Sequence, residues 1–189
     1  MATIDTSEFK KGVKFEMEGV PWEIVDFQHV KPGKGSAFVR TRIKNLITAN
    51  VIDKTFRSGD KVDAAECEEI DASFMYYGDG TYNFMNQESF ETFDVDSTAV
   101  GDNKNFLTEN LKVSVLLYKG RAIAIELPNF IIAKITECEP AIAGNTAQGA
   151  TKSVTVETVY KLQVPLYITE ADVLKIDTRD GRYVERVSK

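Results

Sequence analysis

The residue best placed to act on a partner is a lysine in a short glycine-rich segment, Pro32-Gly33-Lys34-Gly35. Proline presets φ and glycine tolerates positive φ, so this composition predicts a loop between two strands. Because glycine has no side chain, the amine of Lys34 projects furthest from the body and can enter a narrow space. A solvated turn lysine is the simpler interpretation of the loop taken alone, since exposed lysine is the rule.

The strand expected after this loop carries three cations at alternate positions, Arg40, Arg42 and Lys44. Strand side chains repeat with a period of two, so the three cations share one face while Val39, Thr41 and Ile43 share the other. A cationic stripe that leads to a projecting lysine fits a phosphate backbone, because arginine binds phosphate bidentately. A merely solvated strand face is the open alternative.

The sequence supports a catalytic or metal-binding site less well than it supports a phosphate-binding surface. A covalent role for Lys34 needs a depressed pKa, and a wet loop tip does not desolvate an amine. The single histidine, His29, is expected to pack or hydrogen-bond near the loop rather than act as a base. Cys67 and Cys138 are isolated, and the acidic run from Glu66 to Asp71 has no metal-ligand spacing. We therefore predict a non-enzymatic protein with no metal and no cofactor.

Aromatic residues gather between positions 74 and 93. They could form a stacking platform for single-stranded bases, as aromatic side chains do in many nucleic-acid-binding domains. Core packing is the preferred interpretation, because this part of the chain is acidic. The residues concerned are Phe74, Tyr76, Tyr77, Tyr82, Phe84, Phe90 and Phe93.

Composition sets the wider limits. The chain has 189 residues, a net charge of -6 and 43% hydrophobic residues, which suffices for a globular core. No apolar run approaches the roughly 20 residues of a membrane span, and the first residues lack a signal peptide, so we expect a cytoplasmic protein with no membrane partner. Charge is uneven: residues 1–64 hold 11 basic and 9 acidic side chains, whereas residues 65–128 hold 4 and 12.

Short alternating segments separated by turns dominate the chain, which predicts an all-β fold. The absence of βαβ alternation excludes a Rossmann-type sheet. The pattern favours three serial small β-barrels, packed in a fixed, elongated arrangement, with domains at 1–64, 65–128 and 129–189. One short helix is expected over 105–110, and Pro165 marks an edge strand or a bulge. The expected strands are 13–18, 22–30, 37–45, 51–56, 70–77, 81–85, 113–118, 121–126, 130–136, 153–160 and 162–168, with a final hairpin around 179–181.

Several motifs, in order along the whole chain, resemble those of bacterial elongation factor P. The first is the loop Lys31-Pro32-Gly33-Lys34-Gly35-x-Ala37-Phe38. The others are Lys54-Thr55-Phe56-Arg57-Ser58-Gly59, Phe84-Met85-Asn86, Val164-Pro165-Leu166 and Asp177-Thr178-Arg179-x-Gly181-x-Tyr183-x-x-Arg186.

The resemblance implies a KOW-like N-terminal barrel followed by two OB folds, arranged in an L shape. It also implies a ribosome factor that binds beside the P-site peptidyl-tRNA, with the loop tip directed at the CCA end. Such a factor promotes peptide bonds at stalling sequences such as proline runs. It would act as a monomer.

The resemblance further implies site residues. Lys34 aligns with a modified position and belongs to the type that receives β-lysine from a lysyl-tRNA-synthetase-like enzyme. Tyr183 and Arg186 align with residues of the RNA-binding end. Gly144-Asn145-Thr146 stands where the family has Gly-Asp-Thr, and Val159 and Ala171 replace the family's usual glycines. Lys152-Ser153-Val154 likewise replaces Lys-Pro-Ala, so the third domain departs most.

Two other functions stay open beside this one. The residues alone favour a general single-stranded RNA-binding OB protein, which would bind bare oligonucleotides with a strong salt dependence. An enzyme that uses Lys34 covalently would be trapped on a carbonyl substrate by borohydride. The chain could also be a paralogue of elongation factor P that prefers other stalling motifs, which is a variant of the elongation factor interpretation.

Overall fold

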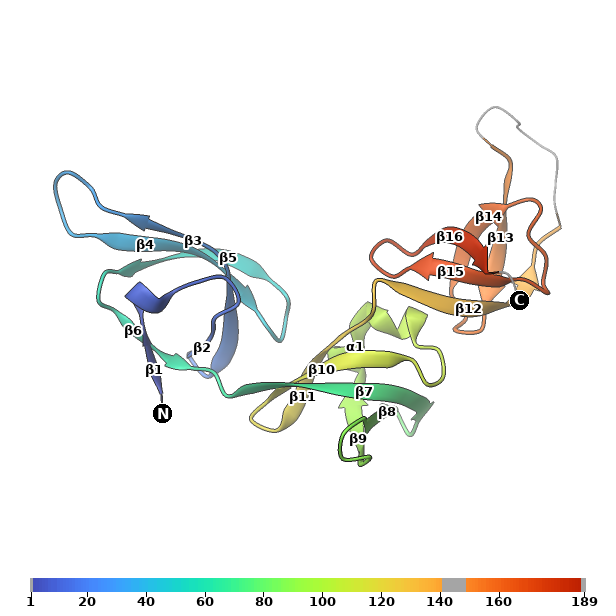
Figure 1. The fold of residues 1–189 in the computed structure, drawn as a ribbon, viewed down its shortest axis with the longest axis horizontal. Helices are drawn as coiled ribbons and strands as arrows, with labels where there is room; N and C mark the ends of the chain where they lie inside the picture. The colour runs from blue at the N-terminus through green and yellow to red at the C-terminus, as the bar shows by residue number, and fades with distance from the viewer. Residues whose placement is uncertain (1, 141–148, 188–189) are drawn as a thin grey trace. The chain divides into compact units, whose positions relative to one another are not determined.

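The computed structural model describes residues 2–140 and 149–187, and strands make up most of their regular secondary structure. The all-β prediction is confirmed: three antiparallel sheets follow one another along the chain (Figure 1). The chain forms two compact units, residues 1–69 with 116–124, and residues 70–115 with 125–189. The three domain boundaries expected from the sequence stay a prediction.

The first sheet has six strands in the order β1-β6-β2-β3-β4-β5. Its core is apolar and partly aromatic, and the rings of Phe9 and Phe56 meet edge to face with centroids 5.2 Å apart. Its elements are β1 (Thr3–Asp5), η1 (Thr6–Glu8), β2 (Lys14–Met17), β3 (Val20–Val30), β4 (Phe38–Asn45), β5 (Val51–Arg57) and β6 (Lys61–Ala64).

The second sheet has five strands in the order β11-β10-β7-β8-β9. Phe84, Val95 and Val115 are fully buried in its core. Its elements are β7 (Cys67–Gly78), β8 (Thr81–Asn86), β9 (Thr92–Asp96), α1 (Ser97–Val100), η2 (Gly101–Phe106), β10 (Lys112–Tyr118) and β11 (Arg121–Glu126).

The turn between β10 and β11 belongs to the first unit, where it is held by a polar cluster on β2. The Tyr118 hydroxyl donates to Glu16 at 2.6 Å, and the Lys119 ammonium lies 2.9 Å from the same carboxylate. These hydrogen bonds, from Tyr118 first and then Lys119, lower the pKa of Glu16. Glu16 therefore stays ionised and ties the turn to the N-terminal sheet.

The third sheet has five strands in the order β14-β13-β12-β15-β16, and the long strand β12 turns Ile131, Ala133 and Ile135 into its core. Pro165 ends β14, which is an edge strand, as the sequence predicts. The elements are β12 (Phe130–Cys138), β13 (Thr151–Val156), β14 (Lys161–Pro165), β15 (Val173–Asp177) and β16 (Arg182–Val187).

Three local predictions differ from the structure. The helix expected over 105–110 is wrong, because the helical residues are 97–106 and Asn110 has a positive φ of 62° in the following turn. The strand expected over 153–160 ends at Val156, since Val159 turns the chain with φ 65°. The strands β1, β6 and β9 were not expected, because they are only 3, 4 and 5 residues long and too short for an alternating pattern.

Candidate functional site

The Lys34 loop connects the two longest paired strands of the first sheet, β3 and β4, whose ladder runs to Val30 opposite Phe38. Lys34 and both flanking glycines are exposed, as expected. Only Gly35 needs the conformational freedom of glycine, because its φ is +104°, whereas the φ of Gly33 is not positive. Neither Lys31 nor Lys34 makes an ion pair with any described residue.

The cationic stripe on β4 is confirmed by its burial pattern. Arg40 and Arg42 are exposed and Lys44 is half-buried, while Val39, Thr41 and Ile43 are buried beneath them. Directly paired residues in an antiparallel sheet share a face, so the register identifies the neighbours of each cation.

Arg42 is already neutralised by the neighbouring strands. It pairs with Asp26 on β3 and with Asp53 on β5, and its Nε lies 3.5 Å from the Asp53 carboxylate. Asp26 also lies 3.1 Å from the Lys11 ammonium, and this hydrogen bond lowers its pKa. The end of the stripe away from the Lys34 loop is therefore close to charge balance.

Arg40, nearer the loop, has no carboxylate beside it. Its paired neighbours are Gln28 and Thr55, and its guanidinium lies 5.7 Å from the ring centroid of Phe38. Phe38 in turn pairs with Arg57 on β5, which is exposed and makes no side-chain ion pair among the described residues. Arg40, Arg57, Lys31 and Lys34 are the unpaired cations at this end, and we name them the hairpin cation group.

Arg57 is the functional candidate that sequence reasoning missed. It stands in one of the family-like motifs, but no periodicity within β5 connects it to β4. Only the β4–β5 register places it beside Phe38.

A surface hollow of about 390 Å³ lies over these strands. Its charged lining residues are Arg40, Arg42, Lys54, Asp26 and Asp53, and the two carboxylates lie opposite Arg42. The part of the hollow at Arg40, beside Gln28 and Thr55, is therefore the part that suits a phosphate group of a nucleic-acid backbone. Lys44 lies further along the stripe, opposite Glu23 and Val51.

His29 contacts an aromatic neighbour on its own strand. Its ring meets Phe27 edge to face with centroids 5.5 Å apart, on an exposed part of β3. No described side chain forms a nucleophile–base pair with it. Among the described residues, no group of three or more His, Cys, Asp or Glu is placed to hold a metal ion.

The third sheet carries the other predicted site residues. Gly144, Asn145 and Thr146 lie outside the described residues. Tyr183 is half-buried, and its hydroxyl lies 3.2 Å from that of Tyr167. Burial first, and then this hydrogen bond, raises the pKa of Tyr183 to about 12.

Arg186 joins the same group through Tyr167. Its guanidinium lies over the Tyr167 ring at 5.8 Å and 3.6 Å from the Asp172 carboxylate. Tyr167, which is 62% exposed, thus connects Tyr183 with Arg186. Sequence reasoning missed it because it lies on the loop after β14, far from both in the chain.

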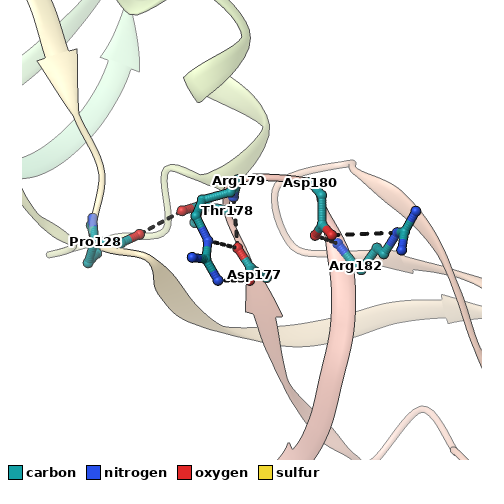
Figure 2. Close-up of polar contacts among 6 residues, drawn as sticks. All are labelled: Pro128, Asp177, Thr178, Arg179, Asp180 and Arg182. Atoms are coloured by element: carbon teal, nitrogen blue, oxygen red, sulfur yellow. Dashed lines mark hydrogen bonds and ion pairs between the residues drawn. The ribbon is translucent and has the colours of Figure 1, made fainter.

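The motif around Asp177 builds the hairpin that presents these residues (Figure 2). The Arg179 side chain donates two hydrogen bonds to Asp177, at 2.9 and 2.6 Å, and its backbone N–H donates a third. These bonds lower the pKa of Asp177 to about 2. Thr178 donates from its hydroxyl to the Pro128 carbonyl at 2.7 Å, which anchors the turn to the start of this sheet.

Glycine is required at the end of this turn. Gly181 has φ +71°, and a Cβ there would overlap the hydroxyl of Tyr160. In contrast to the Lys34 loop, the charged groups of this turn neutralise one another: Arg182 also lies 3.5 Å from Asp180 (Figure 2).

The aromatic residues of the second sheet divide into three groups, of which Tyr82 and Phe93 are the half-buried one. Phe74 and Phe84 are buried, so the core interpretation is correct for them. Tyr76, Tyr77 and Phe90 are 60%, 58% and 69% exposed, so the core interpretation is wrong for these three.

Within the part of the chain that the structure describes, no helix is long and apolar enough to cross a membrane.

Three family models match successive parts of the chain. They are the elongation factor P KOW-like domain over residues 5–62, the elongation factor P OB domain over 67–125, and the elongation factor P C-terminal domain over 124–186.

Curated relatives and solved structures agree with these matches. Elongation factor P of Bdellovibrio bacteriovorus is 46% identical over 98% of both chains, and that of Natranaerobius thermophilus is 44% identical over 97% of this chain and 98% of the relative. A eukaryotic translation initiation factor 5A from Methanococcus jannaschii shares the fold at 20% identity, with a TM-score of 0.53 over 64% of this chain and 90% of that one. On the family models and the near-full-length identity, the chain belongs to the elongation factor P family.

Proposed function

We propose that this protein is a translation elongation factor that binds the ribosome beside the P-site peptidyl-tRNA and promotes peptide-bond formation at stalling sequences such as proline runs. Relatives at about 45% identity bear the name elongation factor P, which supports the translation role. The observation that carries the rest is the hairpin cation group: an exposed lysine at a loop tip, followed by arginines without carboxylate partners.

The chemistry of this group suits an RNA partner. Arg40 and Arg57 flank the half-buried ring of Phe38, so the two guanidiniums are held on one face of the sheet. Phosphate contacts from such a face would set the register of the hairpin on the tRNA acceptor arm. Lys34 would then point toward the CCA end.

The role at the peptidyl-transferase centre would be positional. In this proposal the hairpin supplies no acid or base to the reaction. Holding the peptidyl-tRNA in a reactive geometry would lower the entropic part of the barrier to peptide-bond formation. This part is large when the reactants are poorly placed, as we expect for prolines.

We further propose that Lys34 carries β-lysine, added by a lysyl-tRNA-synthetase-like enzyme. The exposed tip leaves the amine accessible to such an enzyme, and a longer side chain would extend the reach of the loop. The mass of the tryptic or chymotryptic peptide that contains Lys34, from protein made in its native host, tests this. A mass equal to unmodified lysine would contradict it.

The remaining parts of the proposal concern the third sheet and the assembly. Tyr183 and Arg186 would contact RNA, as would the segment Gly144-Asn145-Thr146. The domains would be 1–64, 65–128 and 129–189, and the factor would act as a monomer.

Reconstituted translation of a reporter with a run of prolines tests the function. We expect protein purified from its native host to relieve the stall and its Lys34→Ala variant to fail. Lys10→Ala is the matched control, because it removes an exposed lysine of the same unit outside the hairpin cation group and should keep most of the activity. Equal stalling with and without the native protein would contradict the proposal.

Binding assays separate the general RNA-binding alternative. A single-stranded RNA-binding protein would bind a bare oligonucleotide tightly at low salt. A factor that reads tRNA on the ribosome would bind 70S ribosomes with an occupied P site far better than that oligonucleotide.

A further inference from the structure

Two tyrosines at the end of β7 are exposed although they belong to a paired strand. Tyr76 and Tyr77 are 60% and 58% exposed, immediately before the turn Gly78-Asp79-Gly80. Their backbones pair with Asn83 and Tyr82 on β8, so they sit on a rigid element rather than a loose loop. Rigid aromatic side chains are favoured at protein interfaces because little conformational entropy is lost on binding.

The surroundings of Tyr76 keep one ring face open. The ring lies over Gly78, where an added Cβ would be 3.2 Å from Cε2. No described aromatic ring or cation stacks on Tyr76. Tyr77, by contrast, meets Tyr82 with ring centroids 4.7 Å apart. Tyr76 is therefore the ring of the pair that is free to receive a partner.

Carboxylates accompany Tyr76 on its own face of the sheet. Asn83 pairs with Tyr76 on one side and with Asp94 on the other, so the three form one cross-strand row. Strand spacing places Asp94 about 10 Å from Tyr76. Asp79 lies at the turn three residues along, and neither Asp79 nor Asp94 makes an ion pair with a described residue.

The charge of this part of the chain decides the class of partner. Residues 70–115 contain eight carboxylates and two lysines, a net charge of -6. Phosphate would be repelled from such a surface, whereas a guanidinium or ammonium is attracted both by the carboxylates and by the face of an aromatic ring.

We infer that Tyr76, with Asp79 and Asp94, forms a docking site for a short Lys- or Arg-rich segment of a protein. One cation would lie on the Tyr76 ring and its neighbours would pair with the two carboxylates. The inference rests on the proposed function in one respect, since it takes the partner to be a protein of the ribosome. The docking site is negatively charged, whereas the hairpin cation group is positively charged. The first surface would therefore bind protein and the second RNA.

Site-specific photocrosslinking on 70S ribosomes with an occupied P site tests the inference. The photoreactive residue p-benzoylphenylalanine is placed at Tyr76 in one full-length protein and at Ser36, beside Lys34, in a second. We expect the Tyr76 position to crosslink to a ribosomal protein within a Lys- or Arg-rich peptide, identified by mass spectrometry. Crosslinking to ribosomal RNA, or none while the Ser36 position does crosslink, would overturn the inference alone. If neither position crosslinks, the proposed ribosome binding fails and the docking site fails with it.

Point variants give a second reading. Tyr76→Ala should weaken ribosome binding about fivefold, as truncation of an aromatic anchor does. Tyr76→Phe keeps the ring face and should bind like the parent protein. Asp79→Asn with Asp94→Asn should weaken binding by a similar factor and lower its salt dependence. Equal affinity of all these variants and the parent would contradict the docking site.

Discussion

The hairpin cation group and the Asp177 turn both place arginines in or beside a β-hairpin, yet their charges are balanced in opposite ways. Arg40 and Arg57 have no carboxylate beside them, whereas Arg179 and Arg182 are each bound by an aspartate of their own turn. An unpaired cation gains most from a phosphate, because no internal ion pair has to be broken. The first region is thus built to meet external charge, and the second is built to hold its own shape.

Gly181 in the Asp177 turn and Gly35 in the Lys34 loop both have a positive φ, and replacing them gives the strongest test of that difference. Gly181→Ala should lower the free energy of unfolding of the third sheet by about 3 kcal/mol, because a strained φ is added to an overlap with Tyr160. Gly35→Ala also places a Cβ at a positive φ, but its nearest contact would be Pro32 Cγ at an ordinary 3.9 Å, so it should cost about 1 kcal/mol. Urea unfolding followed by circular dichroism measures both. Equal losses would mean that packing does not distinguish the two hairpins.

Binding should separate Arg40 from Arg42 on the same strand. Arg40→Gln should weaken ribosome binding about tenfold and reduce the salt slope by about 1, as loss of one phosphate contact does. Arg42→Gln is the matched control: it removes an arginine two residues away that is already paired with Asp53. Filter binding at several salt concentrations gives both slopes, and a larger effect for Arg42 would reverse the assignment.

Sequence periodicity was sufficient to place Arg40 and Arg42 on one face, because alternation is a local property of β4. It could not show that only one of them is neutralised. That depends on the register between strands: β5 places Asp53 opposite Arg42, and a β-bulge between Ile24 and Asp26 places Asp26 opposite it on β3. Strand register therefore decides the charge balance of β4, and nothing in the local pattern marks it.

Long-range pairing explains the other omissions. Arg57 and Tyr167 join their sites through strand register and loop packing, which composition does not encode. The helix was misplaced because the residues at 97–106 contain few strong helix formers, and packing against the sheet rather than intrinsic propensity fixes that turn. The exposed tyrosines of β7 were assigned to the core because this part of the chain is acidic, which argued against nucleic-acid bases as their partners but does not exclude exposure.

Asp177 allows a pH test of the self-neutralised turn. Its carboxylate is stabilised by Arg179, and its pKa falls from 3.8 to about 2 on folding. A lowered folded-state pKa means that the stabilisation is complete above pH 3.8 and is lost as the pH falls toward about 2. Asp177→Asn should lower the melting temperature at neutral pH and flatten its decline over that acid range.

Calorimetry at a series of pH values measures the Asp177 effect. Asp53→Asn is the comparison on the first sheet, because Asp53 also faces an arginine but makes only the 3.5 Å contact to Arg42. Its melting temperature should stay close to that of the parent. A loss as large as that of Asp177→Asn would show that the two regions do not differ in how charge supports the fold.

The smallest expected effect concerns the hydroxyl contact between Tyr167 and Tyr183. Tyr167→Phe removes the oxygen 3.2 Å from the Tyr183 hydroxyl but keeps the ring that lies under Arg186. The pKa of Tyr183 should then fall from about 12 toward its ordinary value of 10.0 without reaching it, because burial is the larger cause of the shift and remains. Near-ultraviolet absorbance during an alkaline titration follows this ionisation, with Tyr183→Phe identifying the signal. An unchanged pKa would mean that burial alone sets it, and that this end of the third sheet is held by packing rather than by its internal polar contacts.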